Sequence, residues 1–180
     1  SLADPVARPG RARRPRLPRE SLLIFLTVGT QMAFDRLVAI VDAWAAARDR
    51  VDVVGQIGPS ALKPRHMEWH RSLPPARYRE ILEAADLVVA HAGFGSILMA
   101  LQAAKPIVIF PRRADLREQR NDHQLAVAQT FSDYPGITAA FDEDELRQKL
   151  DGQQNLRPPA KIGPHATPEL LGAVKAFLKE

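Results

Sequence analysis

The feature that most constrains the fold is a series of short apolar runs, each followed by a segment with helical spacing. Apolar residues dominate the runs at 22–28, 51–55, 86–90 and 106–110, as is typical of strands buried on both faces of a parallel sheet. Strands that alternate with helices indicate such a sheet with helices on both of its faces. The sequence therefore predicts an α/β fold built on a mainly parallel sheet.

Helical spacing and turn residues define the remaining elements. Phe34, Leu37 and Trp44 recur on one helical face, and Pro75 suits the first position of another helix. Helices are predicted at 34–48, 75–85, 97–104, 121–131 and 142–150, the last capped by Asp142, and shorter strands at 66–69 and 137–140.

Composition divides the 180 residues into three parts. Residues 21–151 hold the predicted strands and helices and form one domain. Residues 1–20 carry six arginines, four prolines and few apolar side chains, so we expect a disordered extension there. Residues 152–180 are predicted to form a linker and a C-terminal helix.

The net charge of +4 belongs to the extension, because basic and acidic residues balance in the rest of the chain. The extension is either a segment without function or an arm attracted to anionic lipid or nucleic acid. We prefer the first reading and expect no nucleic-acid partner, because no aromatic residues are interleaved for base stacking.

Cysteine is absent, which excludes disulfides, thiolate nucleophiles and cysteine-bound zinc and fits a reducing cytoplasm. No apolar run reaches the ~20 residues of a membrane-spanning helix, and no signal peptide is indicated. We expect a cytoplasmic protein. No metal site is expected either, since the proline before His66 and the Trp69 between His66 and His70 argue against a helical metal-binding pair.

Ligands of such sheets bind at the carboxyl ends of the strands, which directs attention to the loops at 29–30, 91–96 and 111–124. The second loop reads His-Ala-Gly-Phe-Gly-Ser and opens a helix. Gly93 and Gly95 allow a tight turn, the helix start favours an anion, and Ser96 adds a hydroxyl. A diphosphate site and an ordinary turn fit this spacing equally well. A dinucleotide fingerprint fits poorly, because Leu98 replaces its third glycine.

His91 ends the strand before this turn. A lone histidine there is more often structural than catalytic, but beside a diphosphate it can hydrogen-bond a phosphate or a sugar hydroxyl, and we slightly favour that role. The loop at 111–124 is rich in side chains that bind sugar hydroxyls, phosphate or carboxylate: Arg112, Arg113, Asn121, His123 and Gln124. By composition alone, a solvated charged loop is the better interpretation of that segment.

Three motifs occur in the order of one known family. They are Leu-Thr-Val-Gly-Thr at 26–30, the segment 85–96, and Lys-Pro-Ile-Val-Ile at 105–109 with Asn-Asp-His-Gln at 121–124. Over 22–150 the sequence resembles the glycosyltransferase family 28 C-terminal domain. It looks most like free-standing catalytic subunits of bacterial exopolysaccharide synthesis (PssE-like) and is similar to the soluble subunit of the dolichol-pathway N-acetylglucosaminyltransferase. The resemblance implies that residues 21–151 form a Rossmann-like nucleotide-sugar-binding domain, equivalent to the C-terminal half of a GT-B glycosyltransferase.

The resemblance also implies residue roles. Gly93, Gly95 and Ser96 match the turn that holds the donor diphosphate, and His123 and Gln124 match the pair that contacts the donor sugar. With the loop residues described above, the remaining predicted donor contacts are Gly29, Thr30, Leu73, His91, Arg112, Arg113 and Asn121.

The implied reaction is an inverting transfer, without metal or cofactor, from a UDP-sugar to a polyprenyl-diphosphate-linked saccharide. We expect a glucose-, galactose- or glucuronate-type sugar and a membrane-anchored partner subunit that holds the acceptor and the base. His91 is the catalytic candidate within this chain. The partner would recruit the chain to the inner face of the plasma membrane.

A non-catalytic nucleotide-sugar-binding or enhancer subunit is the alternative. Full-length relatives often place a ribose-binding glutamate where this sequence has Met99, and that departure favours the alternative.

Overall fold

The computed structural model describes residues 22–50 and 52–160, together with four residues of the C-terminal segment: Pro168, Leu170, Gly172 and Val174. The predicted extension at 1–20 lies outside these residues, as does most of the predicted C-terminal helix. The four described C-terminal residues are helical, and the Leu170 side chain is buried.

Six parallel strands form one sheet in the order β3-β2-β1-β4-β5-β6. The strands are β1 (Ile24–Thr27), β2 (Val53–Gln56), β3 (Glu68–His70), β4 (Leu87–His91), β5 (Ile107–Phe110) and β6 (Ile137–Ala139). The chain builds outward from β1 to β3, returns to the centre, and then builds outward from β4 to β6. This arrangement confirms the predicted fold class.

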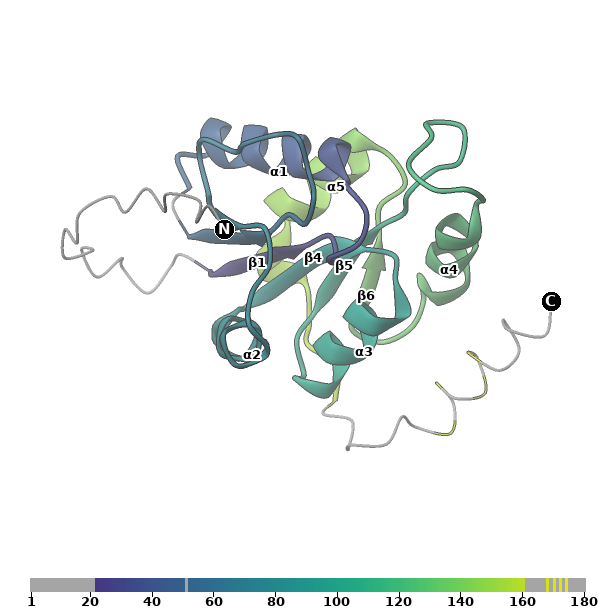
Figure 1. The fold of residues 1–180 in the computed structure, drawn as a ribbon. Coiled ribbons are helices and arrows are strands. Elements are labelled where there is room, and N and C mark those ends of the chain that lie inside the picture. The colour runs from purple at the N-terminus through teal and green to yellow at the C-terminus, as the bar shows by residue number, and fades with distance from the viewer. Residues whose placement is uncertain are drawn as a thin grey trace.

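Helices cover both faces of the sheet (Figure 1). One face carries α1 (Asp35–Ala47) and α5 (Glu143–Asp151), and the other carries α2 (Pro75–Ala84), α3 (Phe94–Gln102) and α4 (His123–Phe131). Alternate strand residues supply the two cores. In β1, Ile24 and Leu26 pack toward α1 and α5, whereas Phe25 packs toward the other layer. All three side chains are fully buried, which explains the uninterrupted apolar run.

Most differences from the predicted elements lie at their ends. The predicted cap of α5 is confirmed, because the Asp142 carboxylate accepts from the Glu145 N–H at 2.8 Å. Helix α3 begins at Phe94, three residues before the predicted start at 97, so its glycine turn runs into the first helical turn. The start of the predicted linker forms a short 3-10 helix at Gln153–Asn155.

The fold predicts a ligand site at the centre of the sheet, where β1 and β4 lie side by side. The segment after β1 leads to α1 on one face, and the segment after the adjacent strand β4 leads to α3 on the other. Two neighbouring strands whose connections diverge in this way leave a crevice at their carboxyl ends, where open α/β sheets bind ligands.

Candidate functional site

An open cleft of about 430 Å³ lies at the carboxyl ends of β1 and β4. Six of its lining residues are predicted donor contacts: Gly29, Thr30, Leu73, His91, Gly95 and Ser96. Six others were not predicted from the sequence: Thr27, Gln56, Pro75, Tyr78, Arg79 and Met99.

The start of α3 forms one wall of the cleft. Gly93 precedes the helix with extended backbone angles, and no side chain of the described chain caps the helix start. The first turn of a helix carries N–H groups without intrahelical partners and a partial positive charge. A Cβ atom placed on Gly95 would meet no atom within 4 Å. The wall therefore combines N–H donors with open space, as an anion requires.

The His91 ring fills the space between two glycines. A Cβ atom on Gly93 would lie 2.4 Å from His91 Nε2, and one on Gly29 would lie 3.4 Å from Cε1. Gly29 also has a φ of +77°, a conformation that favours glycine. Both glycines are thus explained by the imidazole and by the turn itself, before any ligand is considered.

Burial and the nearby Arg112 charge together lower the pKa of His91 to about 4, although the Thr27 backbone opposes the fall. The Nδ1 atom is buried and has no partner at hydrogen-bonding distance among the described residues. The ring is therefore neutral at physiological pH. A neutral imidazole can accept or donate one hydrogen bond, but a base with so low a pKa removes a proton from a hydroxyl poorly.

The floor of the cleft is a row of polar side chains from two strands and two helices: Thr27, Gln56, Tyr78 and Ser96. Gln56 donates from Nε2 to the Thr27 hydroxyl (3.4 Å) and accepts at Oε1 from the Leu73 N–H (3.0 Å). Burial raises the pKa of Tyr78, and the nearby side chains of Thr27 and Ser96 oppose that rise. Sequence patterns do not reveal this row of polar side chains, because its members come from separate segments that meet only through the strand order.

Arg112 lies behind the cleft rather than on its surface. It is 3% exposed, and its Nη2 donates to the carbonyl oxygens of Val28 (2.9 Å) and Met32 (2.8 Å). Its backbone N–H donates to Gln124 Oε1 at 3.0 Å. The Gln124 side chain is also buried. In this structure the Arg112 side chain fixes the loop after β1 against the loop after β5, and the Gln124 side chain fixes the loop after β5 to the start of α4.

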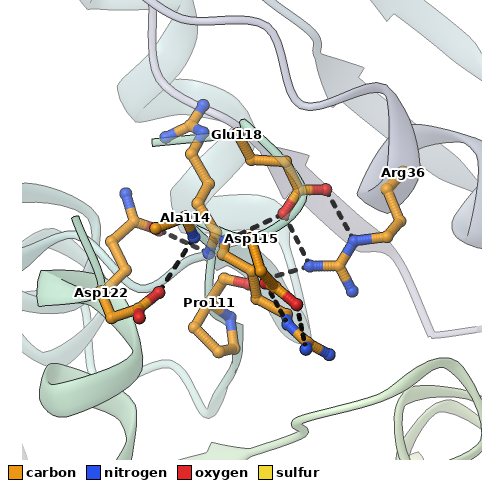
Figure 2. Close-up of polar contacts among 9 residues, drawn as sticks. Arg36, Pro111, Ala114, Asp115, Glu118 and Asp122 are labelled. Carbon is orange, nitrogen blue, oxygen red and sulfur yellow. Dashed lines mark hydrogen bonds and ion pairs between the residues drawn. The ribbon is translucent and has the colours of Figure 1, made fainter. Parts of the chain in front are cut away.

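The loop at 111–122 is held by a network of charged contacts (Figure 2). Arg36 donates from Nε and Nη2 to the two carboxylate oxygens of Glu118, at 2.7 and 2.8 Å. Glu118 also accepts from the Arg113 N–H (3.0 Å), and Asp122 accepts from the Ala114 N–H (2.9 Å). The loop is therefore an ordered structure and not merely a solvated charged segment.

Two further predicted contacts of this loop have local partners. The Arg113 guanidinium pairs with Asp115 at 2.6 Å, and Asn121 Oδ1 accepts from the His123 N–H at 3.1 Å. His123 begins α4, and its ring centroid lies 6.3 Å from that of Phe94 at the start of α3. His123 thus lies beside the glycine turn, but it is not among the residues that line the cleft.

Among the described residues, no helix combines the length and the apolar character needed to cross a membrane. Within the same residues, no group of three histidine, cysteine or acidic side chains is arranged to hold a metal ion.

Proteins of similar sequence identify the family of this domain. A model of the glycosyltransferase family 28 C-terminal domain matches residues 23–158. The human protein named UDP-N-acetylglucosamine transferase subunit ALG13 is 34% identical over 116 residues, which cover 58% of this chain and 10% of that protein. The mouse protein of the same name is 35% identical over 118 residues, with 58% and 9% covered. The chain thus spans about a tenth of the length of these relatives.

Solved structures show the same fold. The solution structure of ALG13 matches with a TM-score of 0.57 at 18% identity, covering 81% of this chain and 92% of that one. The kitacinnamycin glycotransferase matches with a TM-score of 0.57 at 21% identity, covering 96% and 42%. These structures and the six-stranded sheet establish the Rossmann-like C-terminal half of a GT-B glycosyltransferase. With its family match over most of the domain, the chain belongs to the glycosyltransferase family 28 C-terminal domain family.

Proposed function

We propose that this chain binds the UDP-sugar donor of a two-subunit glycosyltransferase in the cleft between β1 and β4. The observation that carries the proposal is the open start of α3, where a Cβ atom on Gly95 would meet nothing within 4 Å. As UDP leaves the sugar, negative charge builds on the diphosphate, and fixed N–H donors at a helix start stabilise that charge. Family membership supports the same reading.

The acceptor hydroxyl needs a base that the partner supplies. His91 is the histidine that lines the cleft, and its pKa of about 4 suits a hydrogen-bonding role better than proton removal. The related human and mouse proteins are themselves named as subunits. We infer a membrane-anchored partner that binds a polyprenyl-diphosphate-linked saccharide, recruits this chain to the inner face of the plasma membrane and contributes the base, in exopolysaccharide synthesis.

The donor sugar is a neutral hexose or N-acetylhexosamine. A guanidinium is the best match for a uronate carboxylate; the two arginines predicted for the donor already have partners, whereas Arg79 lines the cleft. Arg113 pairs with Asp115, and Arg112 donates to two backbone carbonyls. The relatives are named as UDP-N-acetylglucosamine transferase subunits, so UDP-N-acetylglucosamine joins UDP-glucose and UDP-galactose as a candidate donor, ahead of UDP-glucuronate.

A non-catalytic, donor-binding enhancer subunit is the second candidate. The observation that favours it is Met99, which lines the cleft with an apolar side chain where a ribose-binding acid would fit.

A transfer assay separates the two candidates. The chain, purified with its membrane partner, is given each labelled UDP-sugar and a lipid-linked acceptor, and the Gly95→Glu variant provides the control. The catalytic proposal expects transfer from one neutral UDP-sugar with the wild-type complex and none with the variant complex. Equal transfer by both complexes would contradict it and would leave the enhancer role.

A further inference from the structure

Three hydroxyl groups from three elements meet on the floor of the cleft. Tyr78 comes from α2, Thr27 from the end of β1, and Ser96 from the first turn of α3. All three residues line the cleft, and the Tyr78 hydroxyl lies close enough to the side chains of Thr27 and Ser96 for them to affect its pKa. Each hydroxyl can rotate about its C–O bond and donate to a different acceptor.

Packing does not require a hydroxyl at position 78. The Tyr78 ring lies edge-on to Phe25, with the centroids 5.0 Å apart and an interplanar angle of 75°, and phenylalanine would make the same contact. Burial raises the pKa of Tyr78, so its hydroxyl keeps its proton at neutral pH. The hydroxyl therefore contributes a polar donor to the cleft, not packing to the core.

The other polar group of the floor is already committed. The Gln56 side chain is buried, and its amide links the Thr27 hydroxyl to the Leu73 N–H. The hydroxyls of Tyr78 and Ser96 lie at the opposite end of this polar row, beside the start of α3, where both can donate to a ligand. An ionised diphosphate offers many acceptors and no donor, so it matches two hydroxyl donors at a helix start.

We propose that Tyr78 is a donor-binding residue whose hydroxyl, together with that of Ser96, donates to the diphosphate of the bound nucleotide. This inference rests on the proposed function. On binding, both hydroxyls rotate so that their hydrogens point to phosphate oxygens. No covalent bond changes, and the protein loses no proton.

The test compares UDP with uridine, which lacks the diphosphate. Both ligands are titrated against the wild-type chain and the Tyr78→Phe and Tyr134→Phe variants, with affinities from chemical-shift titrations. We expect Tyr78→Phe to weaken UDP about three- to tenfold, as the loss of one neutral hydrogen bond predicts, and to leave uridine unchanged. Tyr134 is the other tyrosine of the chain and does not line the cleft, so Tyr134→Phe should bind both ligands like the wild type.

Each other outcome overturns the inference. Unchanged UDP binding by Tyr78→Phe would show that the hydroxyl does not contact the ligand. Equal weakening of UDP and uridine, or a fall in melting temperature with it, would assign Tyr78 to the shape of the cleft. A wild-type chain that binds uridine and UDP equally would place no diphosphate at α3. A wild-type chain that binds neither ligand would refute the proposed function as well, which distinguishes the two failures.

Discussion

His91 and Gly93 occupy adjoining space at the end of β4, and Gly29 bounds the ring on another side. We expect Gly93→Ala to lower the free energy of unfolding by about 1–3 kcal/mol, because its Cβ atom overlaps the imidazole in a packed setting. Gly95→Ala is the matched control, since its Cβ atom meets nothing within 4 Å and alanine favours a helix by about 0.5–1 kcal/mol. Urea denaturation measures both. Equal stability of the two variants would contradict the placement of the ring.

The pH dependence of stability follows from the same ring. The pKa of His91 is about 4 in the folded chain and about 6.5 when unfolded, so the unfolded chain binds the proton more tightly. The stability is complete above pH 6.5 and falls as the pH drops from 6.5 toward 4. We expect the wild type to lose about 2 kcal/mol more than His91→Asn between pH 7 and pH 4.5. Denaturant titrations at the two pH values measure this difference, and parallel losses would contradict the low pKa.

The sequence pointed to Gly29, His91 and Gly95, which line the cleft, but not to the residues beneath them. Thr27, Gln56 and Tyr78 lie in three segments whose side chains meet only because β1 is placed between β2 and β4. Arg112 is a different case. Its guanidinium group suggested a ligand contact, yet its Nη2 atom donates to the Val28 and Met32 carbonyls. Only the tertiary fold reveals these partners.

Among the elements, the loop between β5 and α4 depends on one ion pair. The Arg36 and Glu118 side chains are 25% and 12% exposed, so solvent screens them less than the Arg147–Glu143 pair on α5, which is 45% and 54% exposed. We expect Glu118→Ala to cost about 1–2 kcal/mol and to speed amide exchange at 113–118. Arg147→Ala should cost less than about 0.5 kcal/mol. Hydrogen-exchange mass spectrometry tests this, and unchanged exchange in Glu118→Ala would contradict the role of the pair.

The central strands were predictable because burial on both faces leaves no polar position to disguise the pattern. All residues of β1 and β5 are buried. The edge strand β3 is half-buried throughout, and its predicted range 66–69 was displaced from Glu68–His70. The start of α3 was missed by three residues, because Phe94 and Gly95 carry no periodic signal. Phe94 is drawn into the helix by tertiary packing, with its ring 5.6 Å from that of Phe131.

At the scale of the whole molecule, the strand order brings six of the predicted donor contacts together in the cleft at the carboxyl ends of β1 and β4. The connections after β1 and β4 diverge and so open the crevice. The start of α3 supplies a partial positive charge that attracts an anion. The apolar runs and the alternation of elements already predicted this architecture. We assign the binding of the acceptor saccharide to the proposed partner subunit.

The most direct test of the central claim is calorimetric titration of the chain with UDP and NAD, alone and with its membrane partner, alongside the Gly95→Glu variant. The glutamate would place a carboxylate in the open space before α3. We predict that the wild type binds UDP but not NAD, and that the variant keeps its melting temperature but loses UDP affinity by more than about tenfold. Absence of UDP binding in both preparations, or equal affinity in the folded variant, would contradict a nucleotide diphosphate at the start of α3.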